Sequence, residues 1–344
     1  MADPTAAAAA LAEVPPEPGV SKPDPILVAD EVRRSFGGLT AVDVDHLEVQ
    51  RGAITSLIGP NGAGKTTFFN LMTGFDRPDR GKWSFDGQPL AGVPAHRVAR
   101  LGMVRTFQLT KALTRLTVMD NMLLGATGQR GERFLSALLP QIWGSQEQAI
   151  RKRAEELLAR FNMDHMRDEL GGELSGGQRK LLEMARALMV EPKMVMLDEP
   201  MAGVNPALTQ SLLAHVKDLP SFGMTVLFVE HDMDVVMDVS DWVVVMGEGK
   251  ILAEGRPQDV TQNPKVIDAY LGEDHGDQSR FTPAPIAATT AAAAAGIGET
   301  RPSDTAVAAE YVDQPPAESG GDGDAHGDEA DRRSDAVGDE GQQA

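Results

Sequence analysis

The sequence contains no cysteine among its 344 residues, so disulfide bonds and cysteine-ligated zinc are excluded. Long hydrophobic runs are also missing, since no stretch approaches the ~18 apolar residues of a membrane-spanning helix. The N-terminal MADPTAAAAALAEVPPEPG lacks the basic region of a secretory signal. We therefore expect a soluble cytoplasmic protein that reaches a membrane only through partner chains.

Basic charge is scarce as well, and the formal net charge is −19. Residues 273–344 hold 16 acidic and 4 basic side chains among many Ala, Thr, Gly and Pro residues. This composition predicts a disordered acidic tail, because it offers too little apolar surface to fold. A docking segment for a partner is the alternative for the tail. Since nucleic-acid binding requires a basic surface, we expect no nucleic-acid partner.

The rest of the chain divides into an N-terminal segment and one long domain. Residues 1–25 are rich in Ala, Pro and Glu, and we predict that they are disordered. Across residues 26–272, short apolar runs alternate with helical patterns. The runs AITSLIG, KMVMLD and MTVLFVE predict three buried strands. Buried strands that alternate with helices are typical of a parallel α/β sheet.

Two parts of this domain depart from the α/β pattern. The stretch KWSFDGQPL places short apolar-polar segments on both sides of Asp86 and Gly87, which indicates a β-hairpin. The stretch RKRAEELLARFNM places Ala154, Leu157, Leu158 and Phe161 on one face of a helix. We therefore predict a mainly helical subdomain over about 109–180, inserted into the α/β body.

One glycine-rich loop, GPNGAGKTT, matches the phosphate-binding pattern G-x-x-x-x-G-K-[ST] between a predicted strand and a predicted helix. Backbone N–H groups from Gly62 to Lys65 are expected to surround the β- and γ-phosphates of ATP. The Lys65 ammonium neutralises them, and the Thr66 hydroxyl binds Mg²⁺. The predicted ATP-binding residues of the loop are Gly59, Pro60, Asn61, Gly62, Ala63, Gly64, Lys65, Thr66 and Thr67.

Two carboxylates, Asp198 and Glu199, follow the predicted strand 194–197. The carboxyl ends of parallel strands face the ligand crevice of such sheets. We predict that Asp198 holds Mg²⁺ through its water shell. Glu199 is then the candidate that orients and polarises the attacking water. A solvated acidic pair at a strand end is the alternative.

Three single residues are further candidates. His231 ends the predicted strand 225–230 and could contact the γ-phosphate, although a histidine there is often an ordinary polar residue. Gln108 could touch Mg²⁺ or the attacking water, or could cap a helix. Phe36 could stack on adenine, or could belong to the core. The predicted catalytic residues are thus Glu199, His231 and Gln108, and the predicted Mg²⁺ ligands are Thr66, Gln108 and Asp198.

A second glycine-rich loop, LSGGQ, opens a strongly helical stretch. A serine and two glycines before a helix again expose backbone N–H groups to an anion. The first loop, residues 59–67, is called the lysine loop from here on, and it already covers one face of the triphosphate of ATP. The second loop therefore encloses that ATP only if it comes from another subunit. The signature residues predicted to contact a partner's ATP are Leu174, Ser175, Gly176, Gly177 and Gln178.

GPNGAGKTT, Gln108, LSGGQ, VMLDEP and His231, in this order, resemble the ATP-binding subunits of ABC transporters over about residues 26–272. The resemblance implies a P-loop NTPase with a RecA-like parallel sheet core, an antiparallel β subdomain and the inserted α-helical subdomain. It also implies a head-to-tail dimer with two ATP molecules at its interface, closed by ATP binding and opened by hydrolysis. The surface at 106–121 would convey this motion to transmembrane permease subunits at the cytoplasmic face of the plasma (inner) membrane.

A narrower resemblance rests on RTFQ (Arg105–Gln108), MAGVNPAL (Met201–Leu208) and PKVIDAYLG (Pro264–Gly272). These segments are similar to LivG-type ATPases of branched-chain amino-acid importers. Such importers imply an extracytoplasmic solute-binding protein and a second ATPase, either LivF-type or a copy of this chain. The chain departs from many relatives by its intact LSGGQ and by Asn205 where aspartate is usual. These departures leave open the solute and the coupling between the two ATP sites.

Other functional classes explain fewer of these motifs. A soluble ABC ATPase acting on DNA or ribosomes would need long coiled coils, two cassettes in one chain or zinc cysteines. A P-loop GTPase or kinase leaves LSGGQ unexplained, and the guanine motif N-K-x-D is missing. The ATPase of a lipopolysaccharide-export-type system is the alternative within the transporters.

Overall fold

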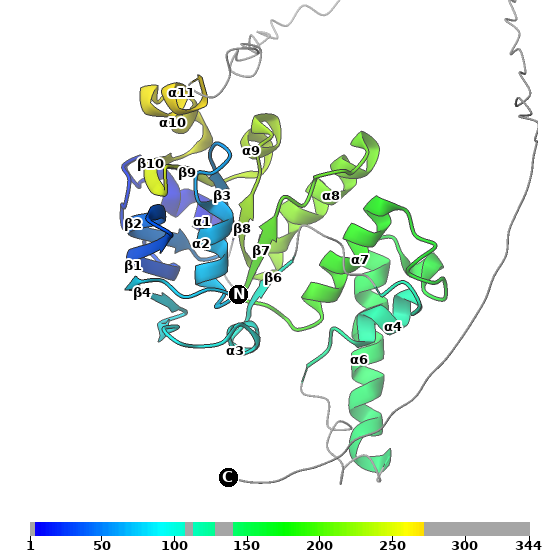
Figure 1. The fold of residues 1–344 in the computed structure, drawn as a ribbon. Coiled ribbons are helices and arrows are strands. Elements are labelled where there is room, and N and C mark those ends of the chain that lie inside the picture. Colours follow the sequence, from blue (N-terminus) through cyan, green and yellow to red (C-terminus); the bar gives the residue numbers. More distant parts are fainter. Residues whose placement is uncertain (1–3, 107–112, 128–139, 272–344) are drawn as a thin grey trace, which may run out of the picture. The chain divides into compact units, whose positions relative to one another are not determined.

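The computed structural model describes residues 4–106, 113–127 and 140–271, and only the backbone of residues 4, 140–143, 207 and 271 (Figure 1). All of these residues belong to one compact unit, Met1–Ala284. Gln108 and the tail at 273–344 lie outside the described residues, so the predictions about them stay predictions. Among the helices within the described ranges, none combines the length and the apolar character needed to cross a bilayer.

A six-stranded sheet forms the centre of the fold, in the order β10-β9-β3-β8-β7-β6 (Figure 1). Its strands are β3 (Ile54–Ile58), β6 (Met103–Arg105), β7 (Met194–Asp198), β8 (Thr225–Val229), β9 (Trp242–Gly247) and β10 (Lys250–Gly255). All neighbours pair in parallel except β9 and β10. The three predicted strands are β3, β7 and β8, and every residue in them is buried. The predicted α/β class is therefore confirmed.

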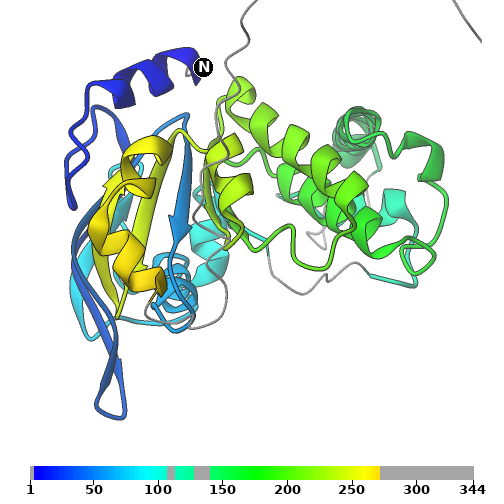
Figure 2. The same ribbon diagram turned by 90° about the horizontal axis from the view of Figure 1, so that it is seen from above.

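A second, antiparallel sheet has the order β2-β1-β4-β5. Its strands are β1 (Pro25–Phe36), β2 (Leu39–Gln50), β4 (Arg80–Phe85) and β5 (Gln88–Pro89). Figure 2 shows the long β1–β2 hairpin in blue. Asp86 and Gly87, at the predicted hairpin, join β4 to β5 with φ of 49° and 73°, which is typical of the tight turns that match strand twist.

The predicted helical segment, about 109–180, contains α4 (Val118–Leu123) and α6 (Pro140–Arg160), and α7 (Gly176–Leu188) begins inside it and ends beyond it. Ala154, Leu157 and Leu158 on α6 and Phe161 directly after it are all buried, as their spacing predicts. They share one hydrophobic cluster with Val195 of β7 and other sheet residues, so this segment and the sheet have a common core. The other helices described are α1 (Pro4–Ala12), α2 (Lys65–Met72), α3 (Ala95–Arg100), η2 (Asp164–Met166), α8 (Pro206–Asp218), η3 (Leu219–Phe222), α9 (Met233–Val239), α10 (Pro257–Thr261) and α11 (Pro264–Leu271).

The prediction of a disordered N-terminus is wrong for residues 4–25. They contain α1, whose Leu11 is only 1% exposed within the main core, and they lead into β1. The segment is held by Glu254, whose two oxygens accept hydrogen bonds from the backbone of Gly19, from Lys22 Nζ at 2.8 Å and from Trp242 Nε1 at 2.9 Å. Composition alone could not reveal these partners, because Glu254 lies more than 200 residues further along the chain.

Candidate functional site

Backbone geometry explains the glycines of the lysine loop. Gly59 has φ 146°, and a Cβ there would lie 2.1 Å from the Met246 carbonyl oxygen. Gly64 has φ 99°, and a Cβ there would lie 2.2 Å from the Ala41 carbonyl oxygen. An L side chain at either position would overlap backbone atoms of β9 or β2, so both positions require glycine. The lysine loop therefore contacts the six-stranded sheet at Gly59 and the antiparallel sheet at Gly64.

The loop opens directly into α2, which begins at Lys65. Gly64 at the N-cap provides no side-chain cap, so the first N–H groups of the helix are available to an anion. Phe68 and Phe69 are fully buried one turn later and fix the direction of α2. Lys65 Nζ donates to the carbonyl oxygens of Gly59 at 2.6 Å and Pro60 at 2.8 Å. The ammonium is thus held over the loop, where a phosphate would lie.

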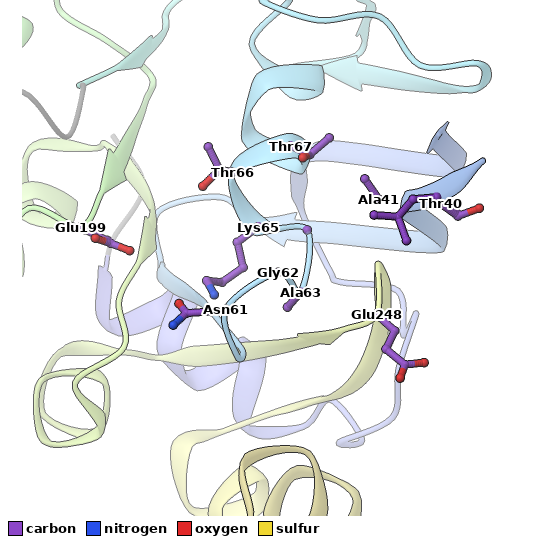
Figure 3. Close-up of a pocket in the computed structure, with 12 residues that line it drawn as sticks. Thr40, Ala41, Asn61, Gly62, Ala63, Lys65, Thr66, Thr67, Glu199 and Glu248 are labelled. Atoms are coloured by element: carbon purple, nitrogen blue, oxygen red, sulfur yellow. The ribbon is translucent and has the colours of Figure 1, made fainter. Parts of the chain in front are cut away.

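A pocket of about 660 Å³ adjoins this loop. It is lined by Leu39, Thr40, Ala41, Asn61, Gly62, Ala63, Gly64, Lys65, Thr66, Thr67, Glu199 and Glu248. In the view of Figure 3, Lys65 and Asn61 lie between Glu199, at the end of β7, and Glu248, in the β9–β10 turn. The volume falls within the range of roughly 300–1,000 Å³ that is usual for small-molecule sites. The structure thus combines the predicted phosphate loop and the predicted base in one pocket.

The two carboxylates at the end of β7, Asp198 as its last residue and Glu199 directly after it, have different surroundings. Asp198 is buried, and Arg105 Nη2 donates to its Oδ2 at 2.7 Å. Glu199 is half-buried, with φ 46°, and its N–H donates to the Val229 carbonyl oxygen at 3.0 Å. A positive φ is unfavourable for glutamate, so the neighbouring strand holds this conformation. The turn directs the two adjacent carboxylates to separate places, and only Glu199 lines the pocket of the phosphate loop.

The other two single candidates that the structure describes do not line this pocket. His231 is exposed, with 66% of its side chain accessible, and lines a different pocket with residues 201–204. Its neighbour Glu230 is buried, which raises the pKa of the Glu230 carboxyl. Phe36 ends β1 and is 48% exposed. The centre of its ring lies 4.5 Å from Arg34 Cζ. Its exposure excludes the core alternative, while a role beside adenine stays a prediction.

The signature loop begins α7 with a reciprocal cap. Ser175 Oγ accepts from the Gln178 N–H at 3.3 Å, and Gln178 Oε1 accepts from the Ser175 N–H at 2.8 Å. Leu174 is buried beside them, whereas Ser175 and Gly176 are exposed. A Cβ on Gly177 would overlap the Leu208 side chain of α8. None of the signature residues 174–178 lines the pocket of the lysine loop. The serine thus has a local role as a helix cap, and its role toward a partner's ATP stays a prediction.

Two contacts near Glu199 could not be predicted from local sequence patterns. Lys180 of α7 donates to the backbone carbonyls of Pro200 and Ala202, which fastens the signature helix to the turn after Glu199. Partial burial lowers the pKa of the Lys180 ammonium. Arg105 ends β6 and contacts Asp198 across the sheet. Arg105 belongs to the RTFQ segment and Lys180 lies two residues after LSGGQ, but the spacing within these segments does not identify Asp198 or the carbonyls after Glu199 as their partners.

Asn205, where the sequence departs from the usual aspartate, caps α8. Its Oδ1 accepts from the Leu208 N–H at 2.9 Å. Asparagine and aspartate are equally good N-caps, so the substitution preserves the start of this helix. Compared with aspartate, asparagine removes one negative charge from the turn before α8.

The hydroxyl and carboxylate groups near the lysine loop are of the type that binds Mg²⁺ together with the phosphates of a nucleotide. Within the described ranges, no three His, Asp or Glu side chains form a cluster that could hold a metal ion. Mg²⁺ usually keeps several waters and binds one or two carboxylates together with substrate phosphates. Thr66 at the start of α2 lines the pocket and Asp198 ends β7, and a hydroxyl and a carboxylate are donor types that fit such a site, so their binding of Mg²⁺ stays a prediction.

Comparisons with known proteins agree with this geometry. The family model described as ABC transporter matches residues 42–202, and the model described as branched-chain amino acid ATP-binding cassette transporter matches residues 250–276. The second match covers β10, α10 and α11, none of which lines the pocket of the phosphate loop.

Similar proteins and structures cover the same part of the chain. The high-affinity branched-chain amino acid transport ATP-binding protein BraF of Pseudomonas aeruginosa is 42% identical over 252 residues, covering 72% of this chain and 98% of BraF. The corresponding LivG protein of Escherichia coli is 40% identical, with the same coverage. The crystal structure of a nucleotide-free ATP-binding cassette from an ABC transporter has a TM-score of 0.62 at 38% identity and covers 72% of this chain and 98% of that one. An ADP conformation of such a cassette has a TM-score of 0.63 at 38% identity, with coverage of 72% and 99%. The chain therefore belongs to the family of ATP-binding cassette proteins of ABC transporters.

Proposed function

We propose that this ATPase drives the import of branched-chain or related amino acids. Transmembrane permease subunits would hold it at the cytoplasmic face of the plasma membrane. The relatives that it resembles are branched-chain amino acid transport proteins by name. Its C-terminal segment matches a family model described in the same terms. The second ATPase would be LivF-type or a copy of this chain, and an extracytoplasmic solute-binding protein would deliver the solute.

The observation that supports ATP hydrolysis at this site is the pocket that the lysine loop and Glu199 both line. The N–H groups at the start of α2 and the Lys65 ammonium bind and orient the phosphates. Glu199 accepts a proton from the attacking water, and the turn that holds its φ at 46° fixes the carboxylate for this task. Thr66, Gln108 and Asp198 would hold Mg²⁺, which supplies positive charge to the phosphates. His231 would contact the γ-phosphate once the partner subunit closes the site.

A substitution at Glu199 tests this assignment. Glu199→Gln keeps the size of the side chain and removes its basicity, so ATP should still bind while turnover falls by roughly 10²-fold. The matched control is Glu191→Gln, which changes another glutamate with positive φ that lies at the opposite end of β7 and outside the pocket. We expect the control to hydrolyse ATP like the wild type. Near-normal hydrolysis by Glu199→Gln would refute the assignment.

The transport part is tested in cells that lack this gene. Uptake of labelled leucine should fall, should recover with the wild-type chain or with Glu191→Gln, and should not recover with Glu199→Gln. Unchanged leucine uptake combined with an outer-envelope defect would favour the lipopolysaccharide-export alternative. Unchanged uptake without any envelope defect would contradict the amino-acid assignment and leave the ATPase intact.

A further inference from the structure

Arg105 occupies a buried position at the junction of three elements of the ATP site. It is the last residue of β6, and its side chain is 6% exposed. Nη2 donates to Asp198 Oδ2 at 2.7 Å, and Nη1 donates to Asn70 Oδ1 at 2.6 Å. Its Cζ atom lies 5.6 Å from the centre of the Phe69 ring. One guanidinium therefore connects β6, the last residue of β7, and α2.

The backbone around Arg105 fixes where this guanidinium lies. β6 pairs in parallel with β7, with Arg105 opposite Met196. The next N–H, that of Thr106, donates to the Met196 carbonyl oxygen at 3.0 Å. Asp198 lies two residues beyond Met196 on the same strand, within reach of the arginine side chain. Asn70 is on the first turns of α2, the helix that begins with Lys65 and Thr66.

A buried ion pair of this kind is a weak source of stability, because the cost of removing both charges from water offsets their attraction. Its value lies in geometry, since the planar guanidinium can bind two partners in fixed directions. Here it binds one oxygen of Asp198, whose side chain is 7% exposed. The other oxygen, Oδ1, takes no part in this ion pair.

We propose that Arg105 is a positioning residue for the Mg²⁺-ATP reaction. It holds Asp198 by Oδ2, so that Oδ1 would be available to the water shell of Mg²⁺, and it ties this carboxylate to the helix that presents Lys65 and Thr66. This inference rests on the proposed ATPase mechanism and adds a residue to it. Arg105 does not line the pocket of the phosphate loop. It acts through Asp198, so its loss should affect the metal-dependent part of nucleotide binding and leave the metal-independent part intact.

The test uses the purified full-length chain and three variants, Arg105→Gln, Arg105→Lys and Asn70→Ala. Binding of a fluorescent ATP analogue is measured in EDTA and across a Mg²⁺ titration, together with ATP hydrolysis across the same titration. In EDTA we expect all variants to bind like the wild type, because the lysine loop is unchanged. The half-saturating Mg²⁺ concentration should rise by about 10-fold or more in Arg105→Gln, which is the usual scale for losing a residue that orients a metal ligand.

The other variants separate geometry from charge. Arg105→Lys keeps the charge but can reach only one partner well, so we expect an intermediate Mg²⁺ requirement. Asn70→Ala keeps the ion pair and removes its second anchor, so its effect should be smaller than that of Arg105→Gln. It also keeps the proposal testable if the Arg105 variants do not fold.

A matched control is Arg153→Gln on α6. Arg153 also makes two contacts, an ion pair with Glu191 at 2.8 Å and a hydrogen bond to the Leu188 carbonyl at 2.9 Å, and it lies outside the ATP pocket. Its Mg²⁺ dependence should match the wild type. An unchanged Mg²⁺ requirement in Arg105→Gln would overturn the proposal, as would loss of nucleotide binding in EDTA, which would show a collapsed loop. If the wild type itself failed to hydrolyse Mg²⁺-ATP, the proposed function would fail instead.

Discussion

Glu199, Asp198 and Arg105 show what a sequence can reveal about single residues. The strand end predicts that Asp198 and Glu199 lie near the phosphate loop, because carboxyl ends of parallel strands face the ligand crevice. It cannot predict that the turn sends only Glu199 into the pocket, since this depends on a φ of 46° held by the Val229 carbonyl. Nor can it predict Arg105 as the partner of Asp198, because that pairing arises from the packing of β6 against β7.

His215 on α8 provides a test at this scale that depends on pH. Its ring stacks on Phe161, with centroids 4.4 Å apart. Burial lowers the pKa of His215 below its ordinary value of 6.5, and the positive charge of Arg160 lowers it further. The unfolded chain therefore takes up this proton first as pH falls below about 6.5, so the stability gained from neutral His215 is present above that pH and lost below it.

His215→Phe keeps the stacked ring and removes the titration. Relative to the wild type, this variant should be more stable at pH 5.5 than at pH 8, as measured by urea denaturation at both values. Other titrating groups, such as Glu230, are present in both proteins and cancel in the difference. His165→Phe, at an exposed position, is the control. A variant-minus-wild-type difference that is the same at both pH values would contradict the linkage.

Among the elements, the strongly patterned ones could be predicted and the N-terminal ones could not. Continuous apolar runs identified β3, β7 and β8, and helical spacing identified the buried face of α6. Both signals are local, because each element carries its own periodicity. By contrast, α1 is an alanine-rich helix with one large apolar side chain, Leu11. Leu11 packs in the main core, and Glu254 holds the segment that follows α1, and no local pattern reports either contact.

Leu11→Ala measures how much α1 contributes to the fold. Leu11 is almost fully buried in the core cluster, so the substitution should lower the free energy of unfolding by about 2–5 kcal/mol. Urea denaturation of the full chain would measure this loss. Ala8→Ser changes an exposed residue of the same helix and should cost less than about 1 kcal/mol. Equal denaturation midpoints for Leu11→Ala and the wild type would mean that residues 4–12 detach without unfolding the domain.

For the whole molecule, the two glycine-rich loops are the feature that a single chain does not explain. Both open helices, α2 and α7, and both expose backbone at the surface, at Asn61 and Gly62 and at Ser175 and Gly176. The signature residues do not line the pocket of the lysine loop in the same chain. Two chains arranged head to tail would bring the loop at Ser175 to the pocket of the other chain. The second glycine-rich loop and the resemblance to ABC transporter ATPases predict this pairing, and the exposure of both loops is compatible with it.

Cysteine cross-linking tests the head-to-tail pairing, because the chain has no native cysteine. Asn61→Cys and Ser175→Cys are prepared in separate chains, each with Glu199→Gln to slow hydrolysis and hold the ATP-bound state. A short bis-maleimide spans more than the ~7 Å Cα separation that limits a direct disulfide. The mixture should form a covalent dimer with Mg²⁺-ATP and much less without nucleotide. Asn61→Cys mixed with Lys152→Cys, an exposed site on α6, is the control and should not cross-link.

The outcome also identifies the partner. If the second ATPase is a different chain, mixing two copies of this one yields little product, and each variant must be paired with the matching position of that protein. A product in the hetero pairing alone would assign this chain to a mixed dimer, with the Ser175 loop serving the ATP of its neighbour. Absence of product in both pairings, or linkage only within a chain that carries both cysteines, would contradict the head-to-tail dimer. Ser175 would then be explained by the cap that it forms with Gln178 at the start of α7.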